Sequence, residues 1–247
     1  MLAQFNGKEP WEDIPEGPLI AIADAMIEYI EKRPHTIYFI LVRSIHGSQA
    51  FILPPLMLQD GELVSGWGQA FRTIPADVFS RIVALVCDGH QGLVYGAKRF
   101  GWLLQRCHFH LLARIAHNIS FGPSGKNSSL GIKIQQLAHT ILYKKEISLV
   151  NAALDEIRVI RKAITSSSLR TVLSGFLKHY EDYRTYLESP HYQLPSTSNT
   201  AEHLVGLVRD LQYRAHGFRT ADSLFAWVNG FCKYRKSVTC RPKIQPN

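Results

Sequence analysis

RIVALVCDGHQGL (81–93) joins a run of apolar residues to an acid and a glycine. Residues 82–86 are apolar without alternation, which is typical of a strand covered on both faces of a sheet. Gly89 marks the turn out of this strand, so Asp88 is placed at its carboxyl end. Ligands of open α/β sheets gather at such ends, although Asp-Gly is also an ordinary turn dipeptide. Asp88 is therefore a candidate metal ligand that needs partners elsewhere in the chain.

Apolar patterns on both sides of this stretch predict an α/β fold. Runs rich in β-branched or aromatic residues predict strands at 19–27, 36–43 and 49–53. Helical spacing predicts a helix at 62–74 and a second one after Asp88. WLLQRC (102–107) predicts a further strand. The resulting order β-β-β-α-β-α-β resembles the ribonuclease H fold, which has a mixed sheet at its core.

The chain divides into four segments according to these patterns. After residue 107, apolar residues recur at spacings of three and four, which predicts an all-helical block. A linker that contains Pro and Ser ends this block, and helices are predicted beyond it at 199–214 and 220–235. The predicted segments are 1–17 (N-terminal extension), 18–107 (ribonuclease H-like core with the strands and first two acids), 108–195 (all-helical insertion) and 196–247 (C-terminal helices that complete the core).

Basic residues concentrate in the second half of the chain. The formal net charge is +8, but residues 1–104 carry −3, whereas residues 105–195 carry +6 and residues 196–247 carry +5. Such an excess favours a polyanionic partner, most commonly DNA or RNA, and the alternative is a solvated basic face without a partner. The candidate DNA-contacting residues are Arg106, Arg114, Lys133, Lys144, Lys145, Arg158, Arg161, Lys162, Arg209 and Arg214.

Composition and spacing also limit the compartment and the cofactors. No apolar run reaches the roughly 18 residues that a membrane span needs, and no signal-peptide core precedes the first strand. The four cysteines are Cys87, Cys107, Cys232 and Cys240. Their irregular spacing predicts reduced thiols, so we expect a cytoplasmic protein, nucleoid-associated if prokaryotic, with no membrane partner. SFGPSGKNS (120–128) departs from the phosphate-loop pattern, so we expect no nucleotide cofactor.

Two further acids are candidate partners for Asp88. Asp24 lies in LIAIADAMI between two alanines, where a half-buried carboxylate is unusual unless something pairs with it. Glu202 lies in SNTAEHLVGLVRD, three residues after Asn199. The alternatives are structural. Asp24 could be an exposed acid of an edge strand, and Glu202 could form a helix-capping box with Asn199 at the N-cap, a function compatible with catalysis.

Together the three acids match the requirements of two-metal phosphoryl chemistry. Mg²⁺ (or Mn²⁺) prefers carboxylate oxygen, and two ions about 3.5 to 4 Å apart stabilise the attacking and leaving oxygens of an in-line displacement. We therefore predict that Asp24, Asp88 and Glu202 are catalytic residues and ligands of two such ions. Their carboxylates should lie within about 4 to 8 Å of a common point. Asn199 is an expected accessory residue near them.

The motifs VCDGHQGL, WLLQRCHFHLL, STSNTAEHLVGLVRD and HGF resemble those of DDE transposases of the Mutator-like insertion-sequence superfamily. In that family the second acid is followed by a Cys or Asp and, three positions later, by a His. Cys107 and His110 match this pair. The third acid follows a Thr/Ser-Asn segment, as Glu202 does. Residues 108–195 would be the family's helical insertion, and Asp24 matches mainly by position. The resemblance implies a core that cuts transposon ends and joins them to target DNA, as a homo-oligomer on DNA.

The chain departs from this family before its first strand. Full-length relatives carry a DNA-binding region there, whereas about 17 residues precede the strand here, too few for a helix-turn-helix domain or a zinc ribbon. We therefore expect a truncated core, of unknown activity, that binds DNA through sequence-independent phosphate contacts. The alternatives are a ribonuclease H-like nuclease that does not join DNA, and an inactive transposase that acts only as a DNA-binding or regulatory protein.

The tetrapeptide CHFH (107–110) also suggests the start of a zinc site. Zinc needs four ligands, however, and the two C-terminal cysteines offer no second pair at a suitable spacing. We therefore expect Cys107 and His110 to lie beside the acids at the end of the fifth predicted strand. There they would orient the DNA or a neighbouring group without binding zinc.

Overall fold

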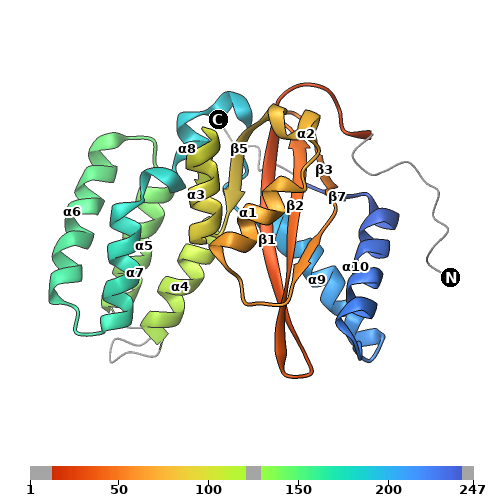
Figure 1. The fold of residues 1–247 in the computed structure, drawn as a ribbon. Helices are drawn as coiled ribbons and strands as arrows, with labels where there is room; N and C mark the ends of the chain where they lie inside the picture. Colours follow the sequence, from red (N-terminus) through yellow and green to blue (C-terminus); the bar gives the residue numbers. More distant parts are fainter. Residues whose placement is uncertain (1–12, 121–128, 241–247) are drawn as a thin grey trace.

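The computed structural model of the chain describes residues 13–120 and 129–240. Most of the predicted N-terminal extension (1–17) and nearly all of SFGPSGKNS (120–128) lie outside the described residues. The described part combines a mixed sheet, helices on both faces of this sheet and a helical block beside it (Figure 1). The predicted α/β class is thereby confirmed. Within these ranges, no helix has the combined length and apolarity needed to cross a membrane.

The sheet has an antiparallel half and a parallel half. Its strands in the described residues are β1 (Leu19–Ile30), β2 (Arg33–Ser44), β3 (Gln49–Ile52), β4 (Leu56–Leu58), β5 (Ile82–Cys87), β6 (Leu103–Arg106) and β7 (Ser237–Thr239). The order is β6-β5-β1-β2-β3-β7, and β4 pairs with the first part of β2. β5 and β6 run parallel to β1, whereas β2, β3 and β7 alternate in direction. The sequence did not predict β4 and β7, because three residues are too few to show alternation.

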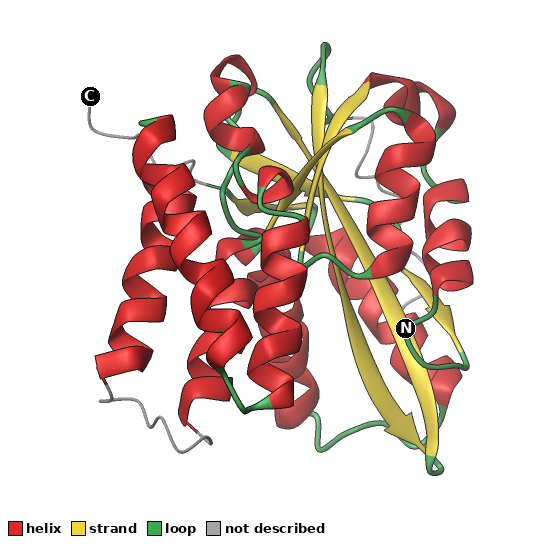
Figure 2. Ribbon diagram, turned by 90° about the vertical axis from the view of Figure 1, so that its left-hand side faces the viewer, coloured by secondary structure: helices red, strands yellow, loops and turns green. Residues whose placement is uncertain are grey.

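β1 and β2 form a long hairpin of 12 residues per strand. Its turn consists of Glu31 and Lys32, whose φ angles of 52° and 64° suit a two-residue turn between antiparallel strands. Pairing continues up to this turn and beyond the ends of the predicted strands. Backbone hydrogen bonds do not depend on side-chain polarity, so the apolar runs underestimated the strand lengths. The hairpin extends past the rest of the sheet (Figures 1 and 2).

Three short helices and many rings cover one face of the sheet. The helices are α1 (Val64–Arg72), α2 (Ala76–Arg81) and α3 (Gln91–Phe100). Trp67 and Phe71 of α1 are buried, and Phe71 makes edge-to-face contacts with Phe100 and Trp102, with centroids 5.7 and 5.5 Å apart. We call this side, with these four residues, the aromatic face. The sequence did not predict α2, because six residues give less than two turns of periodicity.

Two C-terminal helices, α9 (Asn199–Arg214) and α10 (Ala221–Arg235), cover the opposite face. The apolar stripe of α9 comprises Ala201, Leu204, Val205 and Val208. This spacing of three and four places the stripe on one side of the helix, where it packs on apolar residues of β1 and β2. Both helices predicted for this segment are confirmed, and α10 begins one residue later than expected.

A helical block lies between β6 and α9 in the sequence and beside the sheet in space (Figure 1). Its elements are α4 (His108–Ser120), α5 (Ser129–Tyr143), α6 (Ile147–Ala163), α7 (Ser167–Lys178), the 3-10 turns η2 (Glu181–Tyr183) and η3 (Pro190–Tyr192), and α8 (Thr185–Glu188). The block has its own apolar core. Gln105 of β6 joins it to the sheet by donating to Tyr183 O (3.0 Å) and accepting from Tyr186 N (2.9 Å). The block is thus anchored beside the end of β5.

Candidate active site

Asp24 lies within β1, and Asp88 directly follows β5, the parallel neighbour of β1. Ile22 pairs with Val86, and each acid lies two residues beyond its member of this pair. Side chains two positions apart on a strand point to the same face of a sheet. Asp24 therefore belongs to the face that α9 covers, where Ile22 and Val86 contribute to the core, and the charge interaction between Asp88 and Asp24 indicates that Asp88 lies near it.

Glu202 joins this face from the first turn of α9. The buried neighbours Ala201 and Val205 hold the helix against the sheet, and the Ser198 hydroxyl donates to Glu202 Oε1 at 2.9 Å. The alternative interpretation of Glu202, a capping box with Asn199 at the N-cap, is wrong. The N-cap is Ser198, the helix begins at Asn199, and the Ser198 side chain makes no capping hydrogen bond. Glu202 lies four residues after this N-cap, and its carboxylate accepts the Ser198 hydroxyl. We call the side with Asp24, Asp88 and Glu202 the acidic face.

The three carboxylates influence one another electrostatically. Burial raises the pKa of Asp24 from 3.8 to about 7, and the charges of Asp88 and Glu202 add to this increase. A hydrogen bond from Ala25 N to Asp24 Oδ1 (2.9 Å) and the charge of His110 act in the opposite direction. The three acids therefore form one electrostatic unit, in which a bound cation would relieve the repulsion.

A tight turn fixes the position of Asp88. Its Oδ1 accepts a hydrogen bond from His90 N at 2.8 Å, and Gly89 between them has a φ of 95°. A Cβ at Gly89 would lie 3.2 Å from Arg106 Nη1, so glycine leaves room for this guanidinium. Arg106 is also paired with Asp182, with 3.1 Å between Nε and Oδ2. A guanidinium therefore lies beside the Asp88 turn and is partly neutralised by Asp182.

Cys107 and His110 lie beside Glu202. The Cys107 Sγ is 3.8 Å from Glu202 Oε1, and His110 Nδ1 is 3.3 Å from the same oxygen. Cys107 follows β6, and His110 lies in the first turn of α4. Interaction with the Cys107 side chain, partly opposed by burial and assisted by the charges of Glu202 and Asp88, raises the pKa of His110 to about 9. His110 is thus a cation at neutral pH when no metal is bound.

Two polar residues of the site were not predicted from the sequence. Ser198 is buried and, besides its bond to Glu202, donates its backbone N–H to Cys107 Sγ at 3.3 Å. It immediately precedes Asn199, so a serine at a helix start was a visible sign. Asp182 lies in η2, and no sequence pattern links it to Arg106. Asn199, the expected accessory residue, is exposed at the start of α9.

The predicted DNA-contacting residues fall into two groups. The first group has protein partners: Arg106 pairs with Asp182, Lys133 with Glu156, Arg158 with Asp155, and Arg161 with Ser174. The second group is exposed and comprises Arg114, Lys144, Lys145, Lys162, Arg209 and Arg214. The helical block contributes to both groups, whereas α9 contributes only to the exposed one.

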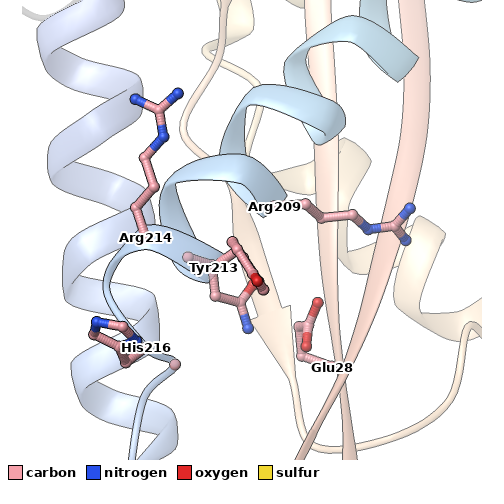
Figure 3. Close-up of a pocket in the computed structure, with 7 residues that line it drawn as sticks. Glu28, Arg209, Tyr213, Arg214 and His216 are labelled. Carbon is pink, nitrogen blue, oxygen red and sulfur yellow. The ribbon is translucent and has the colours of Figure 1, made fainter.

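Arg209 and Arg214 line an open pocket of about 580 Å³ at the far end of α9. Glu28, Tyr213 and His216 also line it, and Figure 3 shows Arg209 extending from α9 toward the strand that carries Glu28. Arg209 is seven residues beyond Glu202, which corresponds to about 10 Å along the helix axis. A basic pocket therefore lies about two helical turns from the acidic face.

Comparisons with known proteins assign no family to this chain. No protein-family model and no curated protein matches it. Its function is therefore inferred from the chemistry of the site and from the resemblance of its motifs.

Proposed function

We propose that this chain is the catalytic core of a DDE transposase of the Mutator-like superfamily, which cuts transposon ends and joins them to target DNA. The observation that carries the proposal is the convergence of Asp24, Asp88 and Glu202 on one face of the sheet. The pKa of Asp24, raised to about 7 by burial and by the two other acids, is the electrostatic result. Strongly perturbed carboxylates of this kind gather at functional sites more often than elsewhere.

The arrangement of the sheet supports a ribonuclease H-like fold for this core. β3, β2 and β1 form an antiparallel meander, and β5 and β6 continue the sheet in parallel to β1. Helices cover both faces. The helical block between β6 and α9 supports the further expectation of an insertion before the third acid.

The donor set fits two Mg²⁺ or Mn²⁺ ions. Asp24, Asp88 and Glu202 offer only carboxylate oxygens, which these hard cations prefer. Bound there, the ions would supply Lewis acidity to the attacking and leaving oxygens of a phosphodiester. Asp24 holds its oxygens on β1, Asp88 holds its oxygens in the turn that follows β5, and Glu202 adds a third group from α9. Because the pKa of Asp24 is about 7, protons compete with cations for this carboxylate, and metal affinity should rise with pH.

The exposed basic residues would hold the DNA against the repulsion of the carboxylates. Contacts from Lys and Arg to phosphates are sequence-independent and weaken steeply with salt. The pocket of Arg209 and Arg214 is one such surface, and the exposed residues of the helical block are another. The implied assembly is a homo-oligomer on DNA.

The proposal is tested by cleavage and strand transfer on DNA that carries the sequences flanking the gene. We expect Mg²⁺-dependent products from the wild type and a loss of at least about a hundredfold in Asp88→Asn and Glu202→Gln, since removing outer-shell partners alone costs 10- to 100-fold. Asp210→Asn is the matched control, because Asp210 is an exposed acid on the same helix as Glu202. Its activity should equal that of the wild type.

Three results would replace the proposal. Cleavage without joined products would indicate a ribonuclease H-like nuclease. DNA binding without cleavage in Mg²⁺ or Mn²⁺ would indicate a DNA-binding or regulatory protein. Full activity of folded Asp88→Asn would remove the acidic face from the mechanism. A binding titration at two salt concentrations, with the element's end and with random duplex, separates phosphate contacts from sequence recognition.

A further inference from the structure

A second set of donor atoms overlaps the acidic face at Glu202. The side chains of Cys107, His110 and Glu202 each present one ligand atom, and these atoms all lie within 4.8 Å of one another. We propose that this cluster is a binding site for a single Zn²⁺ ion. The proposal concerns the metal that these three residues bind and does not depend on the proposed transposase activity.

Two of the three separations between donor atoms match the edges of one tetrahedral ion, and the third, between the Cys107 sulfur and the His110 nitrogen, lies within 4.8 Å. Zn–S bonds of about 2.3 Å and Zn–N or Zn–O bonds of about 2.0 to 2.2 Å imply edges of about 3.6 Å between sulfur and oxygen and about 3.4 Å between nitrogen and oxygen. The observed separations from Glu202 Oε1 are 3.8 Å to Cys107 Sγ and 3.3 Å to His110 Nδ1. Both agree with the tetrahedral edges to within about 0.2 Å.

The cluster is held by backbone contacts. Cys107 donates its N–H to Cys87 O at 2.7 Å, and its Sγ accepts the Ser198 N–H at 3.3 Å, which fixes the sulfur beside the start of α9. Cys107 is fully buried. His110 Nδ1 is also buried and, among the described residues, makes no hydrogen bond of suitable geometry. Glu202 Oε1, 3.3 Å away, is another member of the cluster, and a cation bound between them would satisfy both atoms.

The chemistry of the donors selects zinc over magnesium. Thiolate and imidazole are soft or intermediate ligands that favour Zn²⁺, whereas Mg²⁺ prefers oxygen alone. The sequence argued against zinc because no second cysteine pair is available, but α9 supplies Glu202, 95 residues from Cys107. Three protein ligands leave a fourth position for water or another group, an arrangement that zinc adopts at reactive sites.

Glu202 connects this site to the proposed catalytic function. A carboxylate oxygen bound to Zn²⁺ is withdrawn from the set formed with Asp24 and Asp88. If the proposed function holds, micromolar Zn²⁺ should therefore inhibit Mg²⁺-dependent cleavage. This consequence rests on the proposed function, whereas zinc binding itself does not.

The test is a titration of the metal-free full-length chain with Zn²⁺ against a chromophoric chelator, without DNA or Mg²⁺. We expect one equivalent per chain, with affinity reduced at least a hundredfold in Cys107→Ser and in His110→Ala. Cys107→Ser is nearly isosteric, and His110 is partly exposed, so circular dichroism should report folded proteins in both cases. His203→Ala is the matched control, because His203 is exposed and directly follows Glu202. It should bind as the wild type does.

Co²⁺ substitution adds a spectroscopic criterion. Coordination by Cys107 should produce a sulfur-to-cobalt charge-transfer band in the wild type and in His203→Ala, and no such band in Cys107→Ser. Absence of stoichiometric Zn²⁺ binding by the wild type would overturn the proposal, as would equal binding by folded Cys107→Ser and His110→Ala. Neither result bears on cleavage in Mg²⁺, so failure of the zinc site and failure of the proposed function can be told apart.

Discussion

The two faces of the sheet bury different kinds of side chain. On the aromatic face, α3 approaches α1 so closely that a Cβ on Gly96 would lie 2.4 Å from Phe71 Cε2. On the acidic face, aliphatic residues of α9 pack on β1 and β2, and three carboxylates lie among them. The first face is built for packing. The second accepts buried charge, which destabilises the fold unless a cation or proton neutralises it.

Packing alone accounts for the aromatic face but not for the acidic face. A well-packed core gains nothing from a half-buried aspartate whose pKa has risen to about 7. Strongly perturbed carboxylates gather at functional sites more often than elsewhere, and the packed opposite face supplies stability that offsets the buried acid. Substitutions on the two faces should therefore have opposite effects on the free energy of unfolding.

The largest loss of stability is expected from Trp67→Ala on the aromatic face. Trp67 is fully buried, packs edge to face with Tyr38 at 4.9 Å between centroids, and donates to Glu62 Oε1 at 2.8 Å. Its truncation should lower the free energy of unfolding by about 3 to 5 kcal/mol. Urea denaturation measures this, with Tyr213→Ala as the control, an exposed ring on α9 whose loss should change stability by about 0.5 kcal/mol or less. A loss below 1 kcal/mol for Trp67→Ala would contradict the packing described here.

The next largest effect is expected from Asp24→Asn, which should be more stable than the wild type at neutral pH. Because the folded pKa of Asp24, about 7, lies above the ordinary 3.8, the native state binds this proton more tightly than the unfolded state does. The contribution of Asp24 to the free energy of unfolding should therefore be most favourable near pH 3.8 and should be lost as the pH rises through the folded pKa of about 7. At 1.36 kcal/mol per pKa unit, the fall is about 2 to 4 kcal/mol. The free energy of unfolding of Asp24→Asn should not show this fall.

Urea denaturation between pH 4 and pH 8 in EDTA would measure this difference. Added Mg²⁺ should reduce the fall in the wild type, because a cation that binds only the native state stabilises it. Asp210→Asn, at an exposed position on α9, should follow the wild-type curve. Parallel curves for Asp24→Asn and the wild type would show that Asp24 titrates normally.

A glycine substitution on each face compares how tightly the two faces are packed, and the first is Gly96→Ala. Gly96→Ala on α3 should destabilise by about 1 to 3 kcal/mol, because the new methyl group would overlap the Phe71 ring. A thermal unfolding series would detect this change. Stability equal to or above that of the wild type would mean that α1 and α3 can separate without cost.

The smallest effect is expected from Gly206→Ala, in the interior of α9. No atom of another element lies within 4 Å of the added Cβ. The substitution therefore changes only the helix propensity of this position, which is higher for alanine. The variant should gain about 0.5 to 1 kcal/mol in the same unfolding series. A loss of stability would contradict this and would indicate that α9 is tightly packed at Gly206.

Much of the sheet and the helices could be predicted because each long element has its own periodicity. The two long strands and β5 carry continuous apolar runs, and the helices of the insertion repeat apolar residues every three or four positions. The placement of Asp24 within a strand and of Asp88 at the carboxyl end of another also followed from the strand pattern. Such inferences need only local sequence and the alternation of side chains.

The position of Cys107 and His110 beside the acids was expected, partly from the motif resemblance, but the atoms that Glu202 contacts could not be predicted, because they depend on how distant elements dock. Cys107 and Glu202 are 95 residues apart, and their contact requires α9 to lie across the sheet. Asp182 reaches Arg106 through the docking of the helical block, which no periodicity encodes. The N-cap was misplaced by one residue, since Ser198 and Asn199 have similar capping propensities and only the three-dimensional contact with Cys107 selects between them.

The pairing of β7 with β3 has a consequence for the protein during its synthesis. Ser237 bonds to Gln49, 188 residues earlier, and α9 and α10 cover apolar residues of the N-terminal hairpin. While the ribosome is still translating the helical block, β3 therefore has an unpaired edge and the hairpin exposes a bare apolar surface. Such surfaces recruit chaperones and invite aggregation. Yield in the cell should consequently depend on how quickly the codons for α9, α10 and β7 are read after those of the helical block.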